Sequence, residues 1–191
     1  MNMGKISLLL IAYLIGSIPT ALILSRQIAR MDIRLLGDGN MGARNTQHVL
    51  GWRAGFLVAW VDFLKGVSVI FLARVLQMNL TWQILAGGIA VIGHDFPFFA
   101  DFKGGQGMAT SLGTMSMLFW EETLIGLIFF GVIYLITRQF DLSAAGGLAL
   151  VVFLLVRNLR SSSLLIYTLA CLLTIPIKKI WDAHHRLSGS V

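Results

Sequence analysis

Long apolar runs separated by short polar segments dominate the chain. The first run, residues 6–25, carries no charged residue and is long enough to cross the roughly 30 Å hydrocarbon core of a bilayer as a helix. Six more runs follow, at residues 54–76, 81–99, 107–120, 123–137, 142–156 and 163–177. The pattern predicts an all-α integral membrane protein, a compact bundle of about seven transmembrane helices. Five spans are the alternative, because the last three runs are short.

The first run also predicts a break in its helix. Pro19 follows Gly16 and Ser17, and a proline inside a helix removes a backbone hydrogen bond, so we expect a kink there. The run lacks the short apolar region and small-residue cleavage site of a signal peptide, so we expect it to remain in the mature chain. No internal repeat or linker interrupts residues 1–191, which predicts a single polytopic membrane domain.

The composition agrees with a membrane protein. Of 191 residues, 57% are hydrophobic and 13% are charged, whereas soluble domains carry about 25% charged residues. So few charges could not cover the surface of a soluble globule of this size. The formal charge is +6, but the basic residues lie at the edges of apolar runs rather than on one polar face. This placement argues against nucleic-acid binding and indicates contacts with membrane lipids.

The distribution of basic residues predicts the orientation. With seven spans, an outer N-terminus and a cytoplasmic C-terminus, ten basic residues fall in cytoplasmic segments and four in outer ones, as the positive-inside rule requires. The cytoplasmic set is Arg26, Arg30, Arg34, Arg44, Arg53, Lys103, Arg138, Lys178, Lys179 and Arg186, and the outer set is Lys5, Arg74, Arg157 and Arg160. This orientation puts the two polar loops, residues 26–53 and about 94–107, on the cytoplasmic side.

The first polar loop contains LLGDGNMGARNTQHVLGWRAG, residues 35–55. Glycines let backbone N–H groups approach an anion closely, and asparagine side chains donate hydrogen bonds to its oxygens. Five glycines with Asp38, Asn40, Arg44 and Asn45 predict a poor helix and a ligand-binding loop. A turn-rich loop without a ligand is the alternative.

The second polar stretch is GHDFPFFADFKGGQG, residues 93–107, which runs into the helix-like MATSLGTMSMLF. The free N–H groups at the start of that helix would attract a phosphate, and Lys103 would add a positive charge. The spacing is not that of a P-loop. Two glycine loops on one side of a membrane protein nevertheless predict a site for a small phosphorylated ligand.

Three charged or titratable residues lie within or at the end of apolar runs. His94 is either a buried, hydrogen-bonded histidine or a general base or oxyanion donor. Asp62 and Lys65, three residues apart on one helical face, predict an intramembrane ion pair that is either structural or part of a ligand cavity. The other histidines offer no metal-ligand spacing to His94, and neither HExxH nor CxxC occurs, so no metal is expected.

The stretches GDGNMGARN, DFLKG and GHDFPFFADFKGGQGMAT resemble the bacterial acyl-phosphate:glycerol-3-phosphate acyltransferases, the PlsY family, over residues 6–120. The resemblance implies a seven-span bundle in the bacterial cytoplasmic membrane, with its active site facing the cytoplasm. It implies transfer of a fatty acyl group from acyl phosphate to the sn-1 hydroxyl of glycerol 3-phosphate. The products are lysophosphatidic acid and phosphate, in the first step of phospholipid biosynthesis. No cofactor is implied, because acyl phosphate is already activated and needs only to be positioned.

The polar loops and the resemblance together give the candidate site residues. The catalytic candidates are His94, Asn40 and Asp38. The substrate- and phosphate-binding candidates are Gly39, Gly42, Arg44, Asn45, His48, Lys103, Gly104, Gly105, Gln106, Gly107, Thr110, His184, His185 and Arg186. Asp62 and Lys65 are the candidate intramembrane pair.

The chain departs from the family's motifs at several positions. In the usual GSGNxGATN, Asp38 replaces the serine and Arg44 replaces the threonine. In the usual KGGKG, Gln106 replaces the second lysine. His48 stands where arginine is common. The family's C-terminal motif HRxNIxRLxxGxE is reduced here to WDAHHRLSGSV. Ala183 stands at the position of its asparagine, and Ile180 stands at the position of its first histidine. On balance these changes remove positive charge and add negative charge where phosphate is expected, which predicts weaker phosphate binding.

The departures leave two alternatives to acylation of glycerol 3-phosphate. One is a divergent paralogue that uses acyl phosphate with another small, less anionic acceptor. The other is a non-catalytic lipid-phosphate binder or transporter, since helices interrupted by glycine and proline also occur in transporters. The sequence leaves the acyl-chain preference and the oligomeric state open, with a monomer among the options.

Overall fold

The computed structural model describes residues 3–188, without the side chains at positions 175, 179 and 183–188, and this part of the chain contains helices and no β-strand. The elements in chain order are α1 (Met3–Gly16), α2 (Thr20–Ala29), the 3-10 helix η1 (Ile33–Leu35), α3 (Ala43–Leu50), α4 (Trp52–Val75), α5 (Leu80–Asp95), the 3-10 helix η2 (Phe98–Ala100), α6 (Met108–Leu118), α7 (Trp120–Thr137), α8 (Phe140–Arg157) and α9 (Ser162–Ser188). The predicted all-α class is confirmed.

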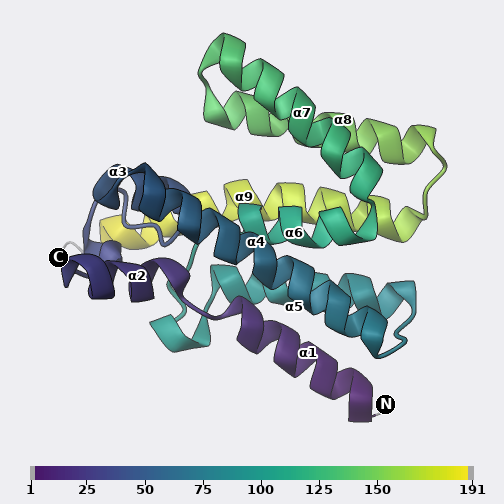
Figure 1. Ribbon diagram of the computed structural model, residues 1–191, viewed down its shortest axis with the longest axis horizontal. Helices are drawn as coiled ribbons and strands as arrows, with labels where there is room; N and C mark the ends of the chain where they lie inside the picture. Colours follow the sequence, from purple (N-terminus) through teal and green to yellow (C-terminus); the bar gives the residue numbers. More distant parts are fainter. Residues whose placement is uncertain (1–2, 189–191) are drawn as a thin grey trace.

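Among the described residues, six segments are long and apolar enough to cross a membrane. They are Met3–Ala29, Trp52–Val75, Leu80–Ala100, Trp120–Thr137, Phe140–Arg157 and Ser162–Asp182. The seventh predicted run, residues 107–120, forms only the eleven-residue α6, which at 1.5 Å per residue is about 16 Å long. This helix still runs antiparallel to α5 and α7, and the two ends of the chain lie at opposite ends of the bundle (Figure 1). Six of the seven predicted runs therefore lie in helical segments long enough to span a membrane, and the seventh is a short helix in the same bundle.

The predicted break in the first run is confirmed. α1 ends at Gly16 and α2 begins at Thr20, with Pro19 directly before it. The proline ring cannot continue the hydrogen-bond ladder of α1, so the backbone between the two helices is irregular. This irregular segment lies inside the span and, as described below, its freed carbonyl group is bonded by a charged side chain of α4.

Close approach of backbones holds the bundle together. α4 packs against α6, α1 against α5, and α7 against α8. A Cβ atom on Gly66 of α4 would overlap the carbonyl oxygen of Thr110, and a Cβ on Gly113 of α6 would overlap the carbonyl oxygen of Phe63. Lipid supplies no hydrophobic driving force between helices, so such small residues bring them into van der Waals contact. Glycines at both contact points thus set the spacing of α4 and α6.

The buried apolar side chains form three clusters. The first joins α6, α8 and α9, and the second joins α1, α4 and α5. The third lies beneath the polar loops and joins α2, η1, α4 and η2; its members are Ala21, Leu22, Ile33, Met41, Val58 and Ala100. It supports the backbone that carries the candidate site.

One sequence prediction about the first loop is wrong. Residues 43–50 form the helix α3, although their glycine- and asparagine-rich surroundings predicted an irregular loop. Gly42 begins the helix in an extended conformation, and Gly51, with a φ of 89°, ends it. A buried asparagine within the helix bonds the preceding loop, so tertiary contacts stabilise a helix that local propensity does not favour.

Candidate functional site

The two polar loops lie together at one end of the bundle, where Arg34 joins them. Its guanidinium donates to both carboxylate oxygens of Asp32, from Nε at 3.0 Å and from Nη2 at 2.8 Å. Its Nη1 donates to the carbonyl oxygen of Ala100 at 3.2 Å and to Asp101 at 3.0 Å. Hydrogen bonding by Arg34 holds the pKa of the Asp32 carboxyl far below its ordinary range, and the same bonds raise the pKa of Arg34. Both groups therefore stay charged across the physiological range.

Asn45 holds the first loop in shape. Its side chain is 2% exposed; Oδ1 accepts from the Asp38 N–H at 3.0 Å, and Nδ2 donates to the carbonyl oxygens of Leu36 and Asn40 at 3.0 and 2.9 Å. A Cβ on Gly37, whose φ is 61°, would overlap Oδ1 of Asn45. The predicted ligand-binding asparagine thus folds the loop, because its amide is already bonded to the backbone.

The other predicted donors of the first loop are also engaged internally. The Gly39 N–H donates to the carbonyl oxygen of Leu36 at 3.0 Å, and the Gly42 N–H donates to Oδ1 of Asn40 at 2.7 Å. Asn40 in turn donates its N–H to Oδ1 of Asp38 at 3.0 Å. In this structure the glycine and asparagine groups stabilise the turn rather than point into an empty anion cradle.

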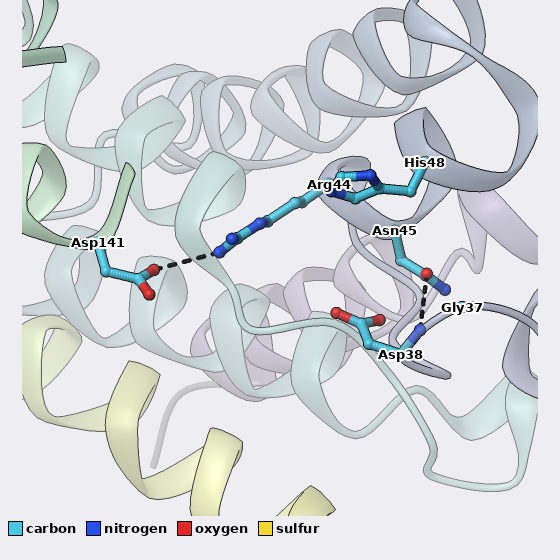
Figure 2. Close-up of a pocket in the computed structure, with 6 residues that line it drawn as sticks. All are labelled: Gly37, Asp38, Arg44, Asn45, His48 and Asp141. Atoms are coloured by element: carbon cyan, nitrogen blue, oxygen red, sulfur yellow. Dashed lines mark hydrogen bonds and ion pairs between the residues drawn. The ribbon is translucent and has the colours of Figure 1, made fainter. Parts of the chain in front are cut away.

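A cavity of about 330 Å³ opens beside this loop and is called the Arg44 pocket below. Its lining residues are Gly37, Asp38, Arg44, Asn45, His48 and Asp141. Figure 2 shows the Arg44 side chain extending from α3 across to Asp141 of α8, with the Asp38 carboxylate beneath it. Nη1 of Arg44 lies 3.3 Å from Oδ1 of Asp141, and the guanidinium lies 5.6 Å from the centre of the Phe140 ring. The pocket therefore combines an arginine and a histidine with two carboxylates.

A second group, called the Asp62 cluster below, lies at the break between α1 and α2. It comprises Asp62, Lys65 and Thr20. Lys65, 4% exposed, donates to Oδ1 of Asp62 at 2.6 Å and to the carbonyl oxygen of Ile18, which the helix break leaves without its usual partner. The Thr20 hydroxyl donates to Oδ1 of Asp62 at 2.9 Å. The structure contains the predicted ion pair between Asp62 and Lys65, and this pair bridges α4 to the kinked first span.

His94 connects the Asp62 cluster to the second loop. Its Nδ1 is 3.7 Å from Oδ1 of Asp62, and its backbone carbonyl accepts from the Gly105 N–H at 3.1 Å. A Cβ on Gly105 would overlap the imidazole ring at Nε2, and one on Gly104 would overlap the His94 carbonyl oxygen. Residues 103–107 can therefore lie against the end of α5 only as glycine-rich backbone.

The remaining candidates of the second loop differ in exposure. Lys103 is exposed, Gln106 is partly buried, and Gly107, with a φ of 67°, precedes α6. The hydroxyl of Thr110 is fully buried and donates to the carbonyl oxygen of Asp62 at 3.1 Å. In this structure Thr110 joins α6 to α4, so among the predicted candidates of this loop Lys103 and Gln106 are the side chains with access to a ligand.

The C-terminal part of α9 reaches the second loop. Lys178 is 3% exposed, pairs with Asp182 and lies 5.2 Å from the centre of the Phe96 ring. Trp181 packs edge-on against the same ring, at 6.4 Å between centres. The side chains of the three candidates from the C-terminal motif, His184, His185 and Arg186, lie outside the described residues, so their role stays a prediction.

Sequence reasoning missed three residues of the site, Thr20, Arg34 and Asp141. Thr20 directly follows the predicted break, which was a usable signal. Arg34 was counted only as a topology charge. Asp141 lies 97 residues from Arg44, so no local pattern could have paired them. Within the described part of the chain, no group of three His, Cys, Asp or Glu side chains could hold a metal ion.

Two solved structures resemble this fold over almost its whole length. Both are crystal structures of PlsY (YgiH), an integral membrane glycerol 3-phosphate acyltransferase. The glycerol 3-phosphate form has a TM-score of 0.86 and 27% sequence identity, and the lysophosphatidic acid form has 0.83 and 26%. Each match covers 97% of this chain and 93% of the other. The fold and its loop-end site thus define an integral membrane acyltransferase.

Sequence comparisons identify the family. Residues 6–187 match the family model described as glycerol-3-phosphate acyltransferase. Glycerol-3-phosphate acyltransferase 2 of Bacillus anthracis is 40% identical over 78% of this chain and 78% of its own length. The glycerol-3-phosphate acyltransferase of Listeria welshimeri is 36% identical over 90% of this chain and 87% of its own. The chain belongs to the glycerol-3-phosphate acyltransferase family, which confirms the resemblance drawn from its motifs.

Proposed function

We propose that the protein transfers a fatty acyl group from acyl phosphate to the sn-1 hydroxyl of glycerol 3-phosphate. The Arg44 pocket carries this proposal, because it puts an arginine and a histidine in a cavity of about 330 Å³ at the loop end of an otherwise apolar bundle. A cavity of this size suits a three-carbon phosphate ester. The membership in the glycerol-3-phosphate acyltransferase family and the likeness to a glycerol 3-phosphate form support the same acceptor.

The chemistry asks for positioning more than for activation. The acceptor oxygen attacks the acyl carbonyl carbon, the bond from that carbon to the phosphate oxygen breaks, and inorganic phosphate leaves. The acceptor proton must pass to a base during the attack. An acyl phosphate has a good leaving group, so holding the two reactants in line supplies much of the rate enhancement.

We assign the acceptor phosphate to Arg44 and His48. Arginine binds phosphate through two parallel N–H bonds, which fixes the orientation of the ester as well as its charge. We assign the donor phosphate to the second loop, where Lys103 is exposed and Gln106 is partly buried. His94 and the Asp62 cluster hold that loop against α5 and α6, so their role is to position it.

Asp38 is the best-placed base among the three catalytic candidates. It is exposed and lines the Arg44 pocket, whereas Asn40 bonds the turn and His94 is 7% exposed against Gly105. We expect Asp38→Asn to lower kcat by roughly 10²- to 10⁴-fold and to flatten the acid limb of the pH profile of kcat/KM. A variant with a wild-type pH profile would exclude Asp38 as the base, even if its rate were low.

The decisive assay uses purified protein in lipid nanodiscs with long-chain acyl phosphate and glycerol 3-phosphate. Lysophosphatidic acid and inorganic phosphate should form in equal amounts. Acyl-CoA and acyl carrier protein thioesters serve as alternative donors. Absence of product with acyl phosphate, or equal rates with a thioester donor, would overturn the proposed donor.

The two carboxylates of the Arg44 pocket favour a second candidate acceptor. Asp38 and Asp141 both line the cavity and would repel a phosphate dianion. A less anionic alcohol or amine would meet less repulsion at the same place. Mass spectrometry of reactions with an acceptor panel decides between the two. Acylation of glycerol 3-phosphate alone agrees with the main proposal, and acylation of a less anionic acceptor instead agrees with the second.

We place the protein in the bacterial cytoplasmic membrane with its loop end towards the cytoplasm, from the excess of basic residues there. Lys103→Cys offers a direct test, because position 103 is exposed and Cys171, the one native cysteine, is 4% exposed. A membrane-impermeant thiol reagent should label this variant in inverted vesicles but not in intact cells. Labelling of intact cells would reverse the orientation.

A further inference from the structure

Arg44 makes its ion pair with a residue from a distant helical hairpin. Asp141 lies in the first turn of α8, and its Oδ1 is 3.3 Å from Nη1 of Arg44. One N–H of the guanidinium carries this bond, and the Arg44 and Asp141 side chains are 57% and 68% exposed. An exposed pair with a single bond contributes little to stability. Arg44 can therefore easily exchange Asp141 for an anion that it binds more strongly.

The α7–α8 hairpin is held firmly against the rest of the bundle at the end far from Asp141. Near the start of α7 and the end of α8, Phe119, Val151 and Leu155 are buried in the cluster shared with α6 and α9. There Glu122, 1% exposed, accepts hydrogen bonds from Arg160 at 2.8 Å and Asn158 at 3.1 Å. At its other end the turn between α7 and α8 stands away from α3 and α4 (Figure 1), and the Arg44–Asp141 pair bridges to it.

We propose that Asp141 competes with the acceptor phosphate for Arg44, so that the hairpin is latched over the Arg44 pocket when the pocket is empty. Binding of the phosphate takes the guanidinium from Asp141 and releases the start of α8. Asp141 thereby sets the affinity for the acceptor and acts as a specificity-determining residue. This inference rests on the proposed function, because it takes the Arg44 pocket as the acceptor site.

The geometry favours the phosphate in this competition. A phosphate dianion can accept two parallel bonds from one guanidinium, whereas Asp141 accepts a single bond from Arg44 at 3.3 Å. Asp141 also lines the pocket, so its charge repels a bound anion until the hairpin moves. An acceptor without a phosphate has no group that displaces Asp141, so it leaves the hairpin latched.

Removing the competitor should tighten acceptor binding. We expect Asp141→Asn to lower KM for glycerol 3-phosphate about three- to fivefold, and we expect the change in KM rather than in kcat. The difference should shrink in high salt, because exposed charges are screened. Asp141→Glu keeps the charge and should stay near the wild-type KM.

Glu121→Gln is the matched control. Glu121 pairs with Arg160 at 3.5 Å at the far end of α7, and its side chain is 55% exposed, so this variant makes the same charge change outside the pocket. Its KM should equal that of the wild type. An Asp141→Asn variant with unchanged or raised KM, or a control with an equal fall in KM, would overturn the latch.

Hydrogen exchange separates the latch from the reaction. Inorganic phosphate should speed exchange of residues 143–147 in the wild type, whereas in Asp141→Asn these amides should exchange fast with or without phosphate. If neither protein acylates glycerol 3-phosphate but the exchange pattern holds, the proposed function fails and the latch stands. If both acylate it with equal KM and phosphate leaves exchange unchanged, the latch fails and the function stands.

Discussion

The ion pair buried at the break of the first span gives the sharpest prediction. Lys65 donates to Asp62 at 2.6 Å and to the carbonyl oxygen of Ile18, and both charged residues are at most 4% exposed. Lys65→Met keeps the length of the side chain and removes the ammonium group. Asp62 then retains the Thr20 hydroxyl as a donor but loses its counter-charge, and the Ile18 carbonyl oxygen keeps only the Thr20 N–H as a donor, at 3.0 Å.

Removing one partner of a buried pair costs about 3–5 kcal/mol, because the remaining charge stays desolvated and unpaired. For a chain of this length 1 kcal/mol corresponds to about 2–4 °C in Tm, so Lys65→Met should lower Tm by about 6–20 °C. The double variant Asp62→Asn, Lys65→Met removes both charges. It should recover most of this loss and remain within about 2 kcal/mol of the wild type.

Thermal unfolding of the four proteins of this cycle in one detergent, followed by circular dichroism, measures the coupling between the two side chains. The wild type, both single variants and the double variant must be compared at equal ionic strength. A loss in Lys65→Met below about 1 kcal/mol, or a double variant as unstable as Lys65→Met alone, would refute a buried, mutually dependent pair.

Two further perturbations address the loops. Gly105→Ala puts a Cβ onto the His94 ring, so we expect the rate of acyl transfer to fall about a hundredfold. Gly131→Ala is the control: its Cβ meets nothing within 4 Å, so the rate should stay within about twofold of the wild type. Equal losses in the two variants would contradict the steric explanation. Arg34→Gln removes the bonds between the two loops and should speed hydrogen exchange of residues 98–103. Acid should likewise lower the protection factors of these amides, that is, their exchange rates relative to the intrinsic rate at the same pH. Asp32, whose folded-state pKa is lowered, contributes stability above its ordinary pKa of about 3.9, and this stability is lost as pH falls below that value. Protection already lost at pH 6 would count against this tie.

Hydropathy predicted six of the spans, because lipid imposes length and apolar character on each helix separately, and Pro19 predicted the break between α1 and α2. The motif residues predicted that both loops contribute to one site. Local patterns could not predict α3, since its stability comes from Asn45 bonding a loop that precedes it in the sequence. The sequence predicts an anion-binding loop at glycines 104 and 105, whereas in the structure these glycines permit close packing on His94. Anion binding and close packing both require the absence of a Cβ atom.

The pairing of Arg44 with Asp141 was also beyond sequence reasoning. The two residues lie 97 positions apart, and Asp141 on its own has the pattern of a solvated charge next to an apolar run. Only the return of the α7–α8 hairpin to the loop end brings them together. The pairing in the Arg44 pocket is therefore set by topology, whereas the residues shared with the family are set by its motifs.

The short α6 has a consequence for where the reactants meet. α6 has eleven residues and α7 eighteen, so their lengths are about 16 and 27 Å, and only Phe119 joins them. At equal tilt the start of α6 lies about 10 Å nearer the middle of the membrane than the far end of α7. Irregular backbone at that depth must be covered by protein or reached by water, so the second loop brings a polar surface below the headgroups. We expect the proposed acyl phosphate donor to react there without drawing its chain into water, which would cost about 0.8 kcal/mol for each methylene exposed.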